Sequence, residues 1–267
     1  MADLYQIEGL HLTLADMTQK PLFGTAPRIE ILKGLTFTIP EGAVIGIVGG
    51  SGSGKSTLGR ALVRLLQPSA GVIRFAGKDI THLEEFELRP LRRRFQMIFQ
   101  DPMSSLNPRH TIGRIIGSPM RLHGFDGINA RVARALDHVG LPAAFGRRYP
   151  HEVSGGQRQR VGIARAIALE PDFILADEIV SGLDVSNQAQ VLRLLEDLVR
   201  ELGLTLAFIS HDLSVIRRLC SRVIVLQGGR IVEDSPTATL FAAPKAAYTR
   251  DLLAAIPLPD PDQVWGV

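Results

Sequence analysis

The most informative segment of the chain is Gly49-Gly50-Ser51-Gly52-Ser53-Gly54-Lys55-Ser56-Thr57. It matches the pattern G-x-x-x-x-G-K-[S/T], and it stands between a strand-like run and a helix-like stretch. The glycines let successive backbone N–H groups turn toward phosphate oxygens, at the positive end of the following helix. The segment therefore predicts a phosphate-binding loop, in which Lys55 reaches the β- and γ-phosphates and the Ser56 hydroxyl ligates Mg²⁺. A purely structural glycine-rich turn is the less favoured interpretation.

Strand-like runs and helical patterns alternate along the rest of the chain. Three short runs are apolar throughout, which is typical of strands buried on both faces of a parallel sheet. They cover residues 44–48, 173–176 and 204–209. Two segments between them, 56–66 and 188–202, carry the apolar stripe of an amphipathic helix. This alternation predicts an α/β fold with a mostly parallel sheet.

Other parts of the chain follow different patterns. The run 222–226 precedes two glycines and a second short run at 230–233, which predicts a hairpin. Residues 29–32 and 35–39 read as two short strands around Lys33 and Gly34, so we expect an antiparallel edge layer near the N-terminus. Residues from about 101 to 160 lack strand-like runs and predict a helical lobe inserted into the core.

Composition excludes several classes of protein. Hydrophobic residues make up 45% of the 267 residues, enough for a sizeable core, and a single cysteine, Cys220, excludes an internal disulfide framework and cysteine-ligated zinc or iron–sulfur sites. We therefore expect a reducing compartment. The first residues lack a secretory pattern, and no apolar run approaches the roughly 18 residues of a membrane span. The net charge of +3 and the arginine runs at 92–94 and 147–148 indicate a solvated face with carboxylate partners rather than a nucleic-acid site.

An acidic pair follows the second apolar run. Asp177 and Glu178 come directly after residues 173–176, at the sheet edge where ligands bind in open α/β folds. Asp177 is suited to hold Mg²⁺, and Glu178 is suited to orient and polarise an attacking water. An acidic pair after a strand also often serves as a helix cap, so this motif indicates a catalytic site only in combination with the phosphate loop.

A second candidate anion site lies at Ser154-Gly155-Gly156-Gln157. We expect Ser154 to cap a helix that starts at about Gln157, with the glycines exposing N–H groups ahead of it. The first loop already holds the γ-phosphate of the chain's own nucleotide, so a second phosphate-binding site on the same subunit is not needed for it. The interpretation that follows is a site facing the nucleotide of a neighbouring chain, with two ATP molecules sandwiched between two subunits. An ordinary capped helix is the alternative.

Taken together, these motifs resemble the nucleotide-binding subunits of ABC transporters, whose signature is the sequence at 154–157. The resemblance covers nearly the whole chain. It implies an α/β fold with a RecA-type P-loop core, a mostly parallel sheet, an antiparallel β edge layer and an inserted helical subdomain at about 101–160. The nucleotide-binding domain would span 1–240, followed by a short C-terminal segment at 241–267.

The same resemblance implies further site residues. Gln100 matches the glutamine that senses Mg²⁺ and the attacking water and links them to the membrane partner. His211 matches the histidine that contacts the γ-phosphate. Ser181-Gly182-Leu183-Asp184 matches the loop that adds Asp184 to the nucleotide-binding residues. ATP and Mg²⁺ are the implied cofactors.

Three segments narrow the resemblance to the ATPases of dipeptide, oligopeptide and nickel importers. They cover residues 96–109, 185–191 and 247–257. The chain departs from the family at Val153, where leucine is usual, at Ile179, where proline is common, and at Gly182, where alanine is common. The aromatic residue that stacks on adenine is not evident, since its usual position falls near Leu14 and Phe23 is the other candidate.

The function expected from this resemblance is an ATP-hydrolysing subunit that energises uptake of peptides or a related small solute. Its partners would be polytopic membrane permease subunits, a second ATPase subunit (a copy or a paralogue) and, indirectly, an extracytoplasmic solute-binding protein. Its place would be peripheral, at the cytoplasmic face of the inner membrane. A nickel or metal-chelate importer is the alternative. A soluble ABC-type ATPase acting on nucleic acid and a small-molecule kinase fit the motifs less well.

Overall fold

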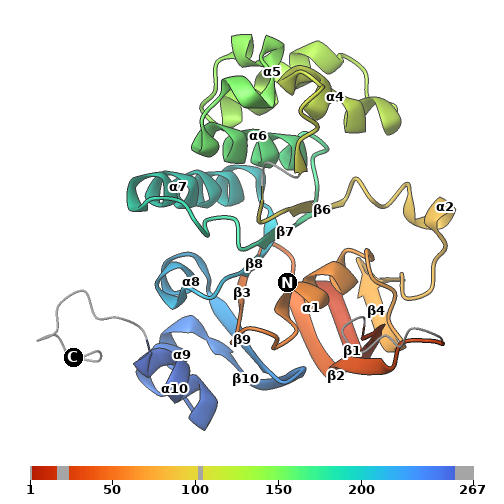
Figure 1. The fold of residues 1–267 in the computed structure, drawn as a ribbon, viewed down its shortest axis with the longest axis vertical. Coiled ribbons are helices and arrows are strands. Elements are labelled where there is room, and N and C mark those ends of the chain that lie inside the picture. The colour runs from red at the N-terminus through yellow and green to blue at the C-terminus, as the bar shows by residue number, and fades with distance from the viewer. Residues whose placement is uncertain (1, 17–23, 102–104, 256–267) are drawn as a thin grey trace, which may run out of the picture. The chain divides into compact units, whose positions relative to one another are not determined.

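The structure is a computed structural model that describes residues 2–16, 24–101 and 105–255. The chain divides into two compact units (Figure 1). The first unit comprises Met1–Leu83 and Phe208–Val267, and the second comprises Glu84–Ala207. Of the expected C-terminal segment at 241–267, residues 256–267 lie outside the described residues.

An antiparallel sheet forms the N-terminal part of the first unit, with strand order β2-β1-β4-β5. This confirms the predicted antiparallel layer, but the two short strands expected around Lys33 and Gly34 are one continuous strand, β2. A register shift in the β1–β2 ladder, between the Leu10–Leu35 and His11–Lys33 pairs, absorbs the irregularity, so Gly34 does not make a turn. The four strands are β1 (Asp3–Ala15), β2 (Arg28–Pro40), β4 (Ala70–Phe75) and β5 (Lys78–Asp79).

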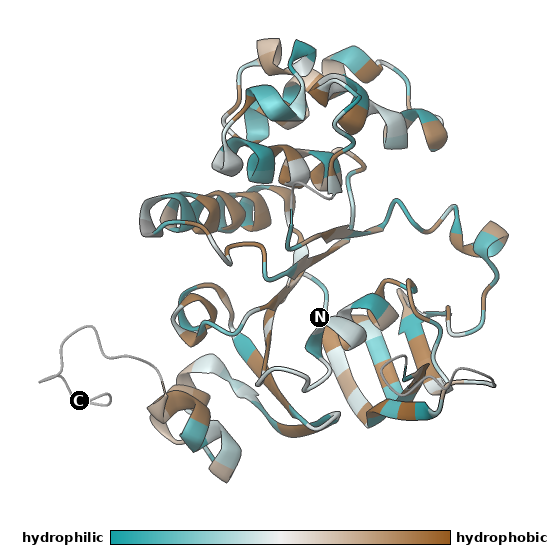
Figure 2. Cartoon of the chain, viewed as in Figure 1, coloured by the Kyte–Doolittle hydropathy of each residue, from teal (hydrophilic) through white to brown (hydrophobic). Residues whose placement is uncertain are grey.

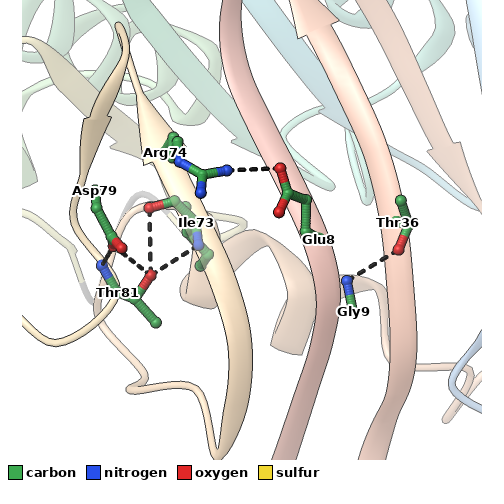
Figure 3. A network of polar contacts seen from close by, with 7 residues as sticks. All are labelled: Glu8, Gly9, Thr36, Ile73, Arg74, Asp79 and Thr81. Carbon is green, nitrogen blue, oxygen red and sulfur yellow. Dashed lines mark hydrogen bonds and ion pairs between the residues drawn. The ribbon is translucent and has the colours of Figure 1, made fainter.

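Polar contacts tie the strands of this sheet together (Figure 3). Arg74 on β4 forms an ion pair with Glu8 on β1, with 2.6 Å between Nη1 and Oε1. Beyond β5, the N–H and the hydroxyl of Thr81 donate to the Asp79 carboxylate at 2.8 and 2.6 Å. These hydrogen bonds, chiefly the one from the Thr81 hydroxyl, hold the pKa of Asp79 below its ordinary value. The carboxylate therefore stays ionised and fixes the turn that follows β5.

A second group of strands in the first unit carries the predicted phosphate loop. The strands β3 (Val44–Val48) and β9 (Arg222–Gln227) pair in parallel, and β10 (Arg230–Pro236) returns antiparallel to β9. The predicted strand at 44–48 and the predicted hairpin are thus confirmed. The strand β8 (Thr205–Ile209) begins in the second unit and ends in the first.

Helix α1 (Lys55–Leu62) follows the loop but ends four residues earlier than the predicted stretch 56–66. The reason is Arg64, which adopts a left-handed conformation with φ of 52° that a continuing helix cannot accommodate. Its guanidinium donates to the carbonyl of Ile80 at 2.6 Å, which holds the chain in that conformation. The other helices of this unit are α8 (Leu213–Leu219), α9 (Thr237–Ala242) and α10 (Ala247–Ala254).

The second unit contains a parallel strand pair and most of the long helices. The strands β6 (Phe95–Ile98) and β7 (Phe173–Asp177) pair with Phe95 opposite Phe173. Every residue of β7 is buried, as the apolar run at 173–176 predicted. The helices of this unit are α2 (Glu85–Leu88), α4 (Ile112–Leu122), α5 (Ile128–His138), α6 (Gly155–Ile167) and α7 (Val185–Leu202), with short 3₁₀ turns at Ala143–Arg147 and Pro150–Glu152.

Helix α7 contains the predicted helical segment 188–202 and begins three residues before it. Figure 2 shows hydrophobic and hydrophilic residues alternating around this helix, as one buried face requires. The buried face includes Val191, Leu195 and Leu198. Parallel strands joined by amphipathic helices, beside an antiparallel layer, confirm the predicted α/β fold. The boundaries expected for the helical subdomain, about 101–160, stay a prediction.

The arginine run at 92–94 has the carboxylate partners that the sequence predicted, whereas the partner recorded for the run at 147–148 is an aromatic ring. Arg92 pairs with Glu85 and Arg94 with Asp172, each with a nitrogen–oxygen distance of 2.6 Å. In the other run, the guanidinium of Arg148 lies 4.3 Å from the centroid of the Phe145 ring, a cation–π contact. Within the described ranges, none of the helices combines the length and the apolar character that a membrane span needs.

Candidate active site

The predicted phosphate loop lies between the end of β3 and the start of α1, as the sequence pattern required. Gly49, Gly52 and Gly54 have φ values of 151°, 73° and 103°, a region that other residues rarely adopt. Lys55 is buried, with 7% of its surface exposed, and its Nζ donates to the carbonyls of Gly49 at 2.8 Å and Gly50 at 2.9 Å. The loop is therefore curled around the amino group of its own lysine.

Contacts with the β9–β10 hairpin hold this loop in place. The N–H of Gly229 donates to the carbonyl of Ser53 at 3.1 Å. A Cβ atom at Gly49 would lie 2.2 Å from the carbonyl oxygen of Leu226, so a side chain cannot be accommodated there. Ser53 is 5% exposed, and its hydroxyl has no hydrogen-bond partner among the described residues. A buried, unsatisfied hydroxyl in a loop of N–H donors fits an anionic ligand such as a phosphate chain.

One contact of the loop was not predicted from the sequence. The N–H of Gly50 donates to the hydroxyl of Tyr248, on helix α10, at 2.7 Å. The two residues are 198 positions apart, and local sequence patterns carry no information on a contact of that kind. One indication in the sequence that Tyr248 matters is that it lies in the segment 247–257, which resembles the ATPases of dipeptide, oligopeptide and nickel importers.

The acidic pair lies at the end of β7 in the second unit. Asp177 is the last residue of the strand and is 4% exposed. Glu178 follows in a left-handed conformation, with φ of 49°, which is uncommon for a residue other than glycine. The side-chain amide of Gln100, which follows β6, donates to Oε2 of Glu178 at 3.2 Å. The structure therefore brings Gln100 and Glu178 together at the carboxyl ends of two neighbouring parallel strands.

Ser154 caps helix α6, as predicted, but the helix begins at Gly155 rather than at about Gln157. The N–H of Gln157 donates to the Ser154 hydroxyl at 3.3 Å, and the Gln157 side chain accepts from the Ser154 N–H at 2.9 Å. This reciprocal capping box satisfies two backbone donors and lets the two glycines form the first helical turn, which explains the earlier start. Helix α6 has 13 residues, and its N-terminal end, at the exposed Ser154, is at the surface. The other N–H groups of its first turn and the positive end of its dipole therefore face solvent.

Asp184 has a structural role in the second unit. Its carboxylate caps helix α7 by accepting from the N–H of Asn187 at 2.9 Å and from the Asn187 side-chain amide at 2.6 Å. The hydrogen bond from the Asn187 N–H is the main reason why the pKa of Asp184 lies below its ordinary value. The same asparagine lies beside Gly156, where an added Cβ would come within 3.0 Å of its Oδ1. Gly182, one of the departures from the family, has φ of 76°, which glycine adopts without strain.

His211 is exposed and follows β8, in the first unit. Its neighbour Ser210 is 3% exposed and donates its N–H to the carbonyl of Ile47 on β3 at 3.4 Å. On the other side, Asp212 caps helix α8 by accepting from the N–H of Ser214 at 2.9 Å. The backbone on both sides of His211 is therefore fixed, and one of these contacts is to the strand that leads into the phosphate loop.

Arg165 connects helix α6 to the segment that follows Gln100. Its Nη1 donates to the carbonyl of Ser105 at 2.6 Å, and burial lowers the pKa of its guanidinium from the ordinary value. Residues 102–104, in the segment after Gln100, lie outside the described residues. Phe23, one of the two candidates for stacking on adenine, also lies outside them.

Hard oxygen ligands are the groups on which a magnesium site would depend. No cluster of three or more histidine, cysteine, aspartate or glutamate side chains occurs in the part of the chain that the structure describes. Mg²⁺ in a nucleotide site takes one or two protein oxygens together with substrate phosphates and water. The side-chain oxygens of Ser56, Gln100 and Asp177 are of the required chemical type.

Comparison with known proteins agrees with this arrangement. Residues 32–181 match the sequence profile of the family described as "ABC transporter". A putative peptide import ATP-binding protein of Brucella ovis is 55% identical over 238 residues, covering 88% of this chain and 75% of that protein. A putative oligopeptide transport ATP-binding protein of Bacillus subtilis, YkfD, is 49% identical, covering 90% of this chain and 74% of that protein.

A solved structure shares the fold. It is a dimeric ATP-binding cassette in a post-hydrolysis state, bound to ADP and Pi. The TM-score is 0.76 at 29% identity, covering 87% of this chain and 98% of that one. The family profile matches more than half of the chain, one relative is 55% identical, and a solved structure shares the fold. These findings agree with the phosphate loop, the acidic strand end and the capped signature helix. The chain therefore belongs to the ABC transporter family and is one of its ATPase cassettes.

Proposed function

We propose that this ABC ATPase energises the import of peptides through separate membrane subunits. The observation that carries the proposal is the 55% identity, over 88% of the chain, to a protein named for peptide import. The relative from Bacillus subtilis is likewise named for oligopeptide transport. These names support peptide as the solute, in preference to nickel or a metal chelate and in preference to a role on nucleic acid.

The phosphate loop is the proposed binding site for ATP. Its glycines adopt conformations that turn backbone N–H groups inward, and its buried lysine supplies a positive charge that can exchange two carbonyl partners for phosphate oxygens. The unsatisfied hydroxyl of Ser53 supports the same use. The residues proposed to hold the nucleotide are Gly49, Gly50, Ser51, Gly52, Ser53, Gly54, Lys55, Ser56 and Thr57.

Mg²⁺ is the proposed metal cofactor, with Ser56, Asp177 and Gln100 as its protein ligands, directly or through water. Their oxygen atoms are the ligand type that Mg²⁺ takes. When bound, the ion supplies positive charge against the negative charge that develops on phosphate oxygens during hydrolysis. Asp177 is suited to this role because it lies buried at the end of a strand, where its position is fixed.

Glu178 is the proposed catalytic base, which orients and polarises the attacking water. Its hydrogen bond with Gln100 supports this role, because the amide fixes the position of the carboxylate at the end of β7. Gln100 in turn would report the state of the site to the membrane partner. His211 is proposed to contact the γ-phosphate, which its rigid backbone setting supports.

The signature residues are proposed to act on ATP bound by a neighbouring ATPase chain. The N–H groups at the start of α6 provide an anion site at an exposed helix end, and a structure of the same fold is dimeric. The neighbour is either a copy of this chain or a paralogue, and we favour a paralogue. The residues proposed to face the neighbour's nucleotide are Ser154, Gly155, Gly156 and Gln157, and Asp184 is proposed as a further nucleotide-binding residue.

The membrane partners proposed are polytopic permease subunits, which the segment 101–109 would contact. This placement makes the chain a peripheral protein at the cytoplasmic face of the inner membrane. An extracytoplasmic solute-binding protein would act indirectly by delivering the solute to the permease. No nucleic-acid partner is proposed.

The test is transport by the reconstituted complex. The chain is assembled in proteoliposomes with the permease subunits and solute-binding protein encoded beside it, and uptake of labelled oligopeptides and of ⁶³Ni²⁺ is measured with ATP or ADP inside. We expect ATP-dependent uptake of peptide. Uptake of nickel without peptide would overturn the choice of solute, and an ATPase rate that responds to nucleic acid but not to the permease would overturn the importer.

A further inference from the structure

We propose that Tyr248, on the C-terminal helix α10, is a positioning residue for the phosphate loop. Its hydroxyl accepts a hydrogen bond from the N–H of Gly50 at 2.7 Å. Gly50 is the second residue of the loop, and both residues belong to the first unit. The inference rests on the proposed binding of nucleotide phosphates by this loop, and it adds a residue outside the loop that sets its shape.

The contact fixes the orientation of one peptide group. The peptide that joins Gly49 to Gly50 donates its N–H to Tyr248 at 2.7 Å, while its carbonyl accepts from Nζ of Lys55 at 2.8 Å. The two bonds hold the two ends of the same planar unit. Tyr248 is therefore connected, through a single peptide group, to the amino group proposed to reach the β- and γ-phosphates.

The side chain of Tyr248 also limits the room at residue 50, where an added Cβ would have to shift the end of the tyrosine. Unlike Gly49, Gly52 and Gly54, Gly50 is not among the described glycines with positive φ, so its backbone conformation is open to other residues. A Cβ atom there would, however, lie 2.9 Å from the Tyr248 hydroxyl, closer than real Cβ contacts come. The glycine provides room for the tyrosine, and the two residues are matched to each other.

Helix α10 is anchored firmly enough to hold Tyr248 in this position. The carboxylate of Glu233, on β10, accepts from the N–H groups of Lys245 at 3.1 Å and Ala246 at 3.0 Å, directly before the helix. Burial alone would raise the pKa of Glu233, but hydrogen bonds from Ala246, Thr249 and Lys245 outweigh it and lower the pKa, so the carboxylate remains charged at the helix N-terminus. Thr249, next to Tyr248, is 1% exposed.

The first experiment measures ATP affinity and thermal stability of the purified chain. Tyr248→Phe removes only the hydroxyl, and we expect the Kd for ATP to rise about twofold to tenfold, the factor that corresponds to one net hydrogen bond. Tyr5→Phe is the matched control, because the Tyr5 hydroxyl donates to the carbonyl of Leu62, at the far end of α1, at 3.1 Å. Tyr5→Phe should lower the melting temperature and leave the affinity unchanged.

The second experiment separates positioning from a general loss of structure. Gly50→Ala alone should weaken ATP binding, because the methyl group displaces the Tyr248 hydroxyl. Once Tyr248→Phe has removed that hydroxyl, adding Gly50→Ala should weaken binding no further. Unchanged affinity in Tyr248→Phe, or fully additive effects in the double variant, would overturn the inference. Failure of the wild-type chain to bind ATP would instead overturn the proposed nucleotide site itself.

Discussion

The side-chain amide of Gln100 donates a hydrogen bond to the carboxylate of Glu178 across 3.2 Å. Gln100 follows β6 and Glu178 follows β7, and these strands are parallel neighbours, so their carboxyl ends lie at one edge of the sheet. The bond links the group proposed to prepare the attacking water to the segment proposed to face the membrane subunits. The role proposed for Gln100 is that information on the state of the site passes to the permease over this short route.

The carboxylate of Glu178 is the group on which hydrolysis should depend most. Glu178→Gln should retain ATP binding and slow hydrolysis by about 10²-fold or more, because a positioned base contributes about 10²–10⁴. The measurement is the ATPase rate in the assembled transporter together with the affinity for ATP. Glu170→Gln is the matched control, since Glu170 is also a glutamate of the second unit with positive φ, 53°, and its carboxylate pairs with Arg131. A near wild-type rate in Glu178→Gln would show that Glu178 is not the catalytic base.

Lys55→Ala should act on binding rather than on the chemical step. The substitution removes a buried charge that two loop carbonyls surround, so we expect the Kd for ATP to rise by at least about tenfold, since hydrogen bonds to charged groups contribute about 1.5–3 kcal/mol. Lys78→Ala, at an exposed position on β5, serves as the control and should bind like wild type. Equal affinities in the two variants would argue against the loop as the nucleotide site.

Ser154→Arg should separate the two nucleotide roles of the chain. The serine caps an exposed helix end, so a bulky side chain there can be accommodated in the isolated chain but would obstruct a closed interface. We expect nucleotide affinity of the isolated chain to persist and turnover of the assembled complex to be lost. Ser154→Thr retains a capping hydroxyl and should keep most turnover. Loss of affinity in the isolated Ser154→Arg chain would mean that the signature serves the chain's own nucleotide.

A cysteine at position 105 should form crosslinks to the permease in membranes. Ser105 belongs to the segment after Gln100, and Arg165 holds its carbonyl at 2.6 Å. A cysteine at Ser104 is expected to do the same, although that residue lies outside the described part of the chain. The native Cys220 should contribute little background crosslinking, because it is buried. Burial raises the pKa of its thiol, which keeps it in the unreactive protonated form. Absence of crosslinks from every position in 101–109 would count against this surface.

Much of the fold could be predicted because several of its strands are continuous apolar runs in the sequence. The runs at 44–48 and 173–176 are apolar at every position, and the structure buries all of β7 and nearly all of β3. Local patterns failed where a distant contact overrides them. Two short strands were expected on either side of Lys33 and Gly34, but pairing with β1 keeps β2 continuous. A hydrogen bond to Ile80 stabilises the left-handed Arg64 that ends α1.

The site was predictable to a similar extent. The phosphate loop, the acidic pair and the signature around Ser154 are each short continuous stretches of sequence, so the three motifs could be recognised together from the sequence. The bond between Gln100 and Glu178 joins residues 78 positions apart, and the contact between Gly50 and Tyr248 spans 198. The family resemblance gave Gln100 and Glu178 roles toward the same attacking water but did not predict their bond, and the second contact was not anticipated either, because contacts of this range depend on how helices and strands pack.

The left-handed backbone of Glu178 affects how a saturation library at this codon should be interpreted. Asparagine, aspartate and glycine tolerate φ near 49°, whereas valine, isoleucine and threonine are strained by it. An inactive β-branched variant would therefore report a displaced strand end as much as a missing carboxylate. Only replacements that share the shape or the backbone tolerance of glutamate, such as glutamine or aspartate, measure the chemistry of the side chain itself.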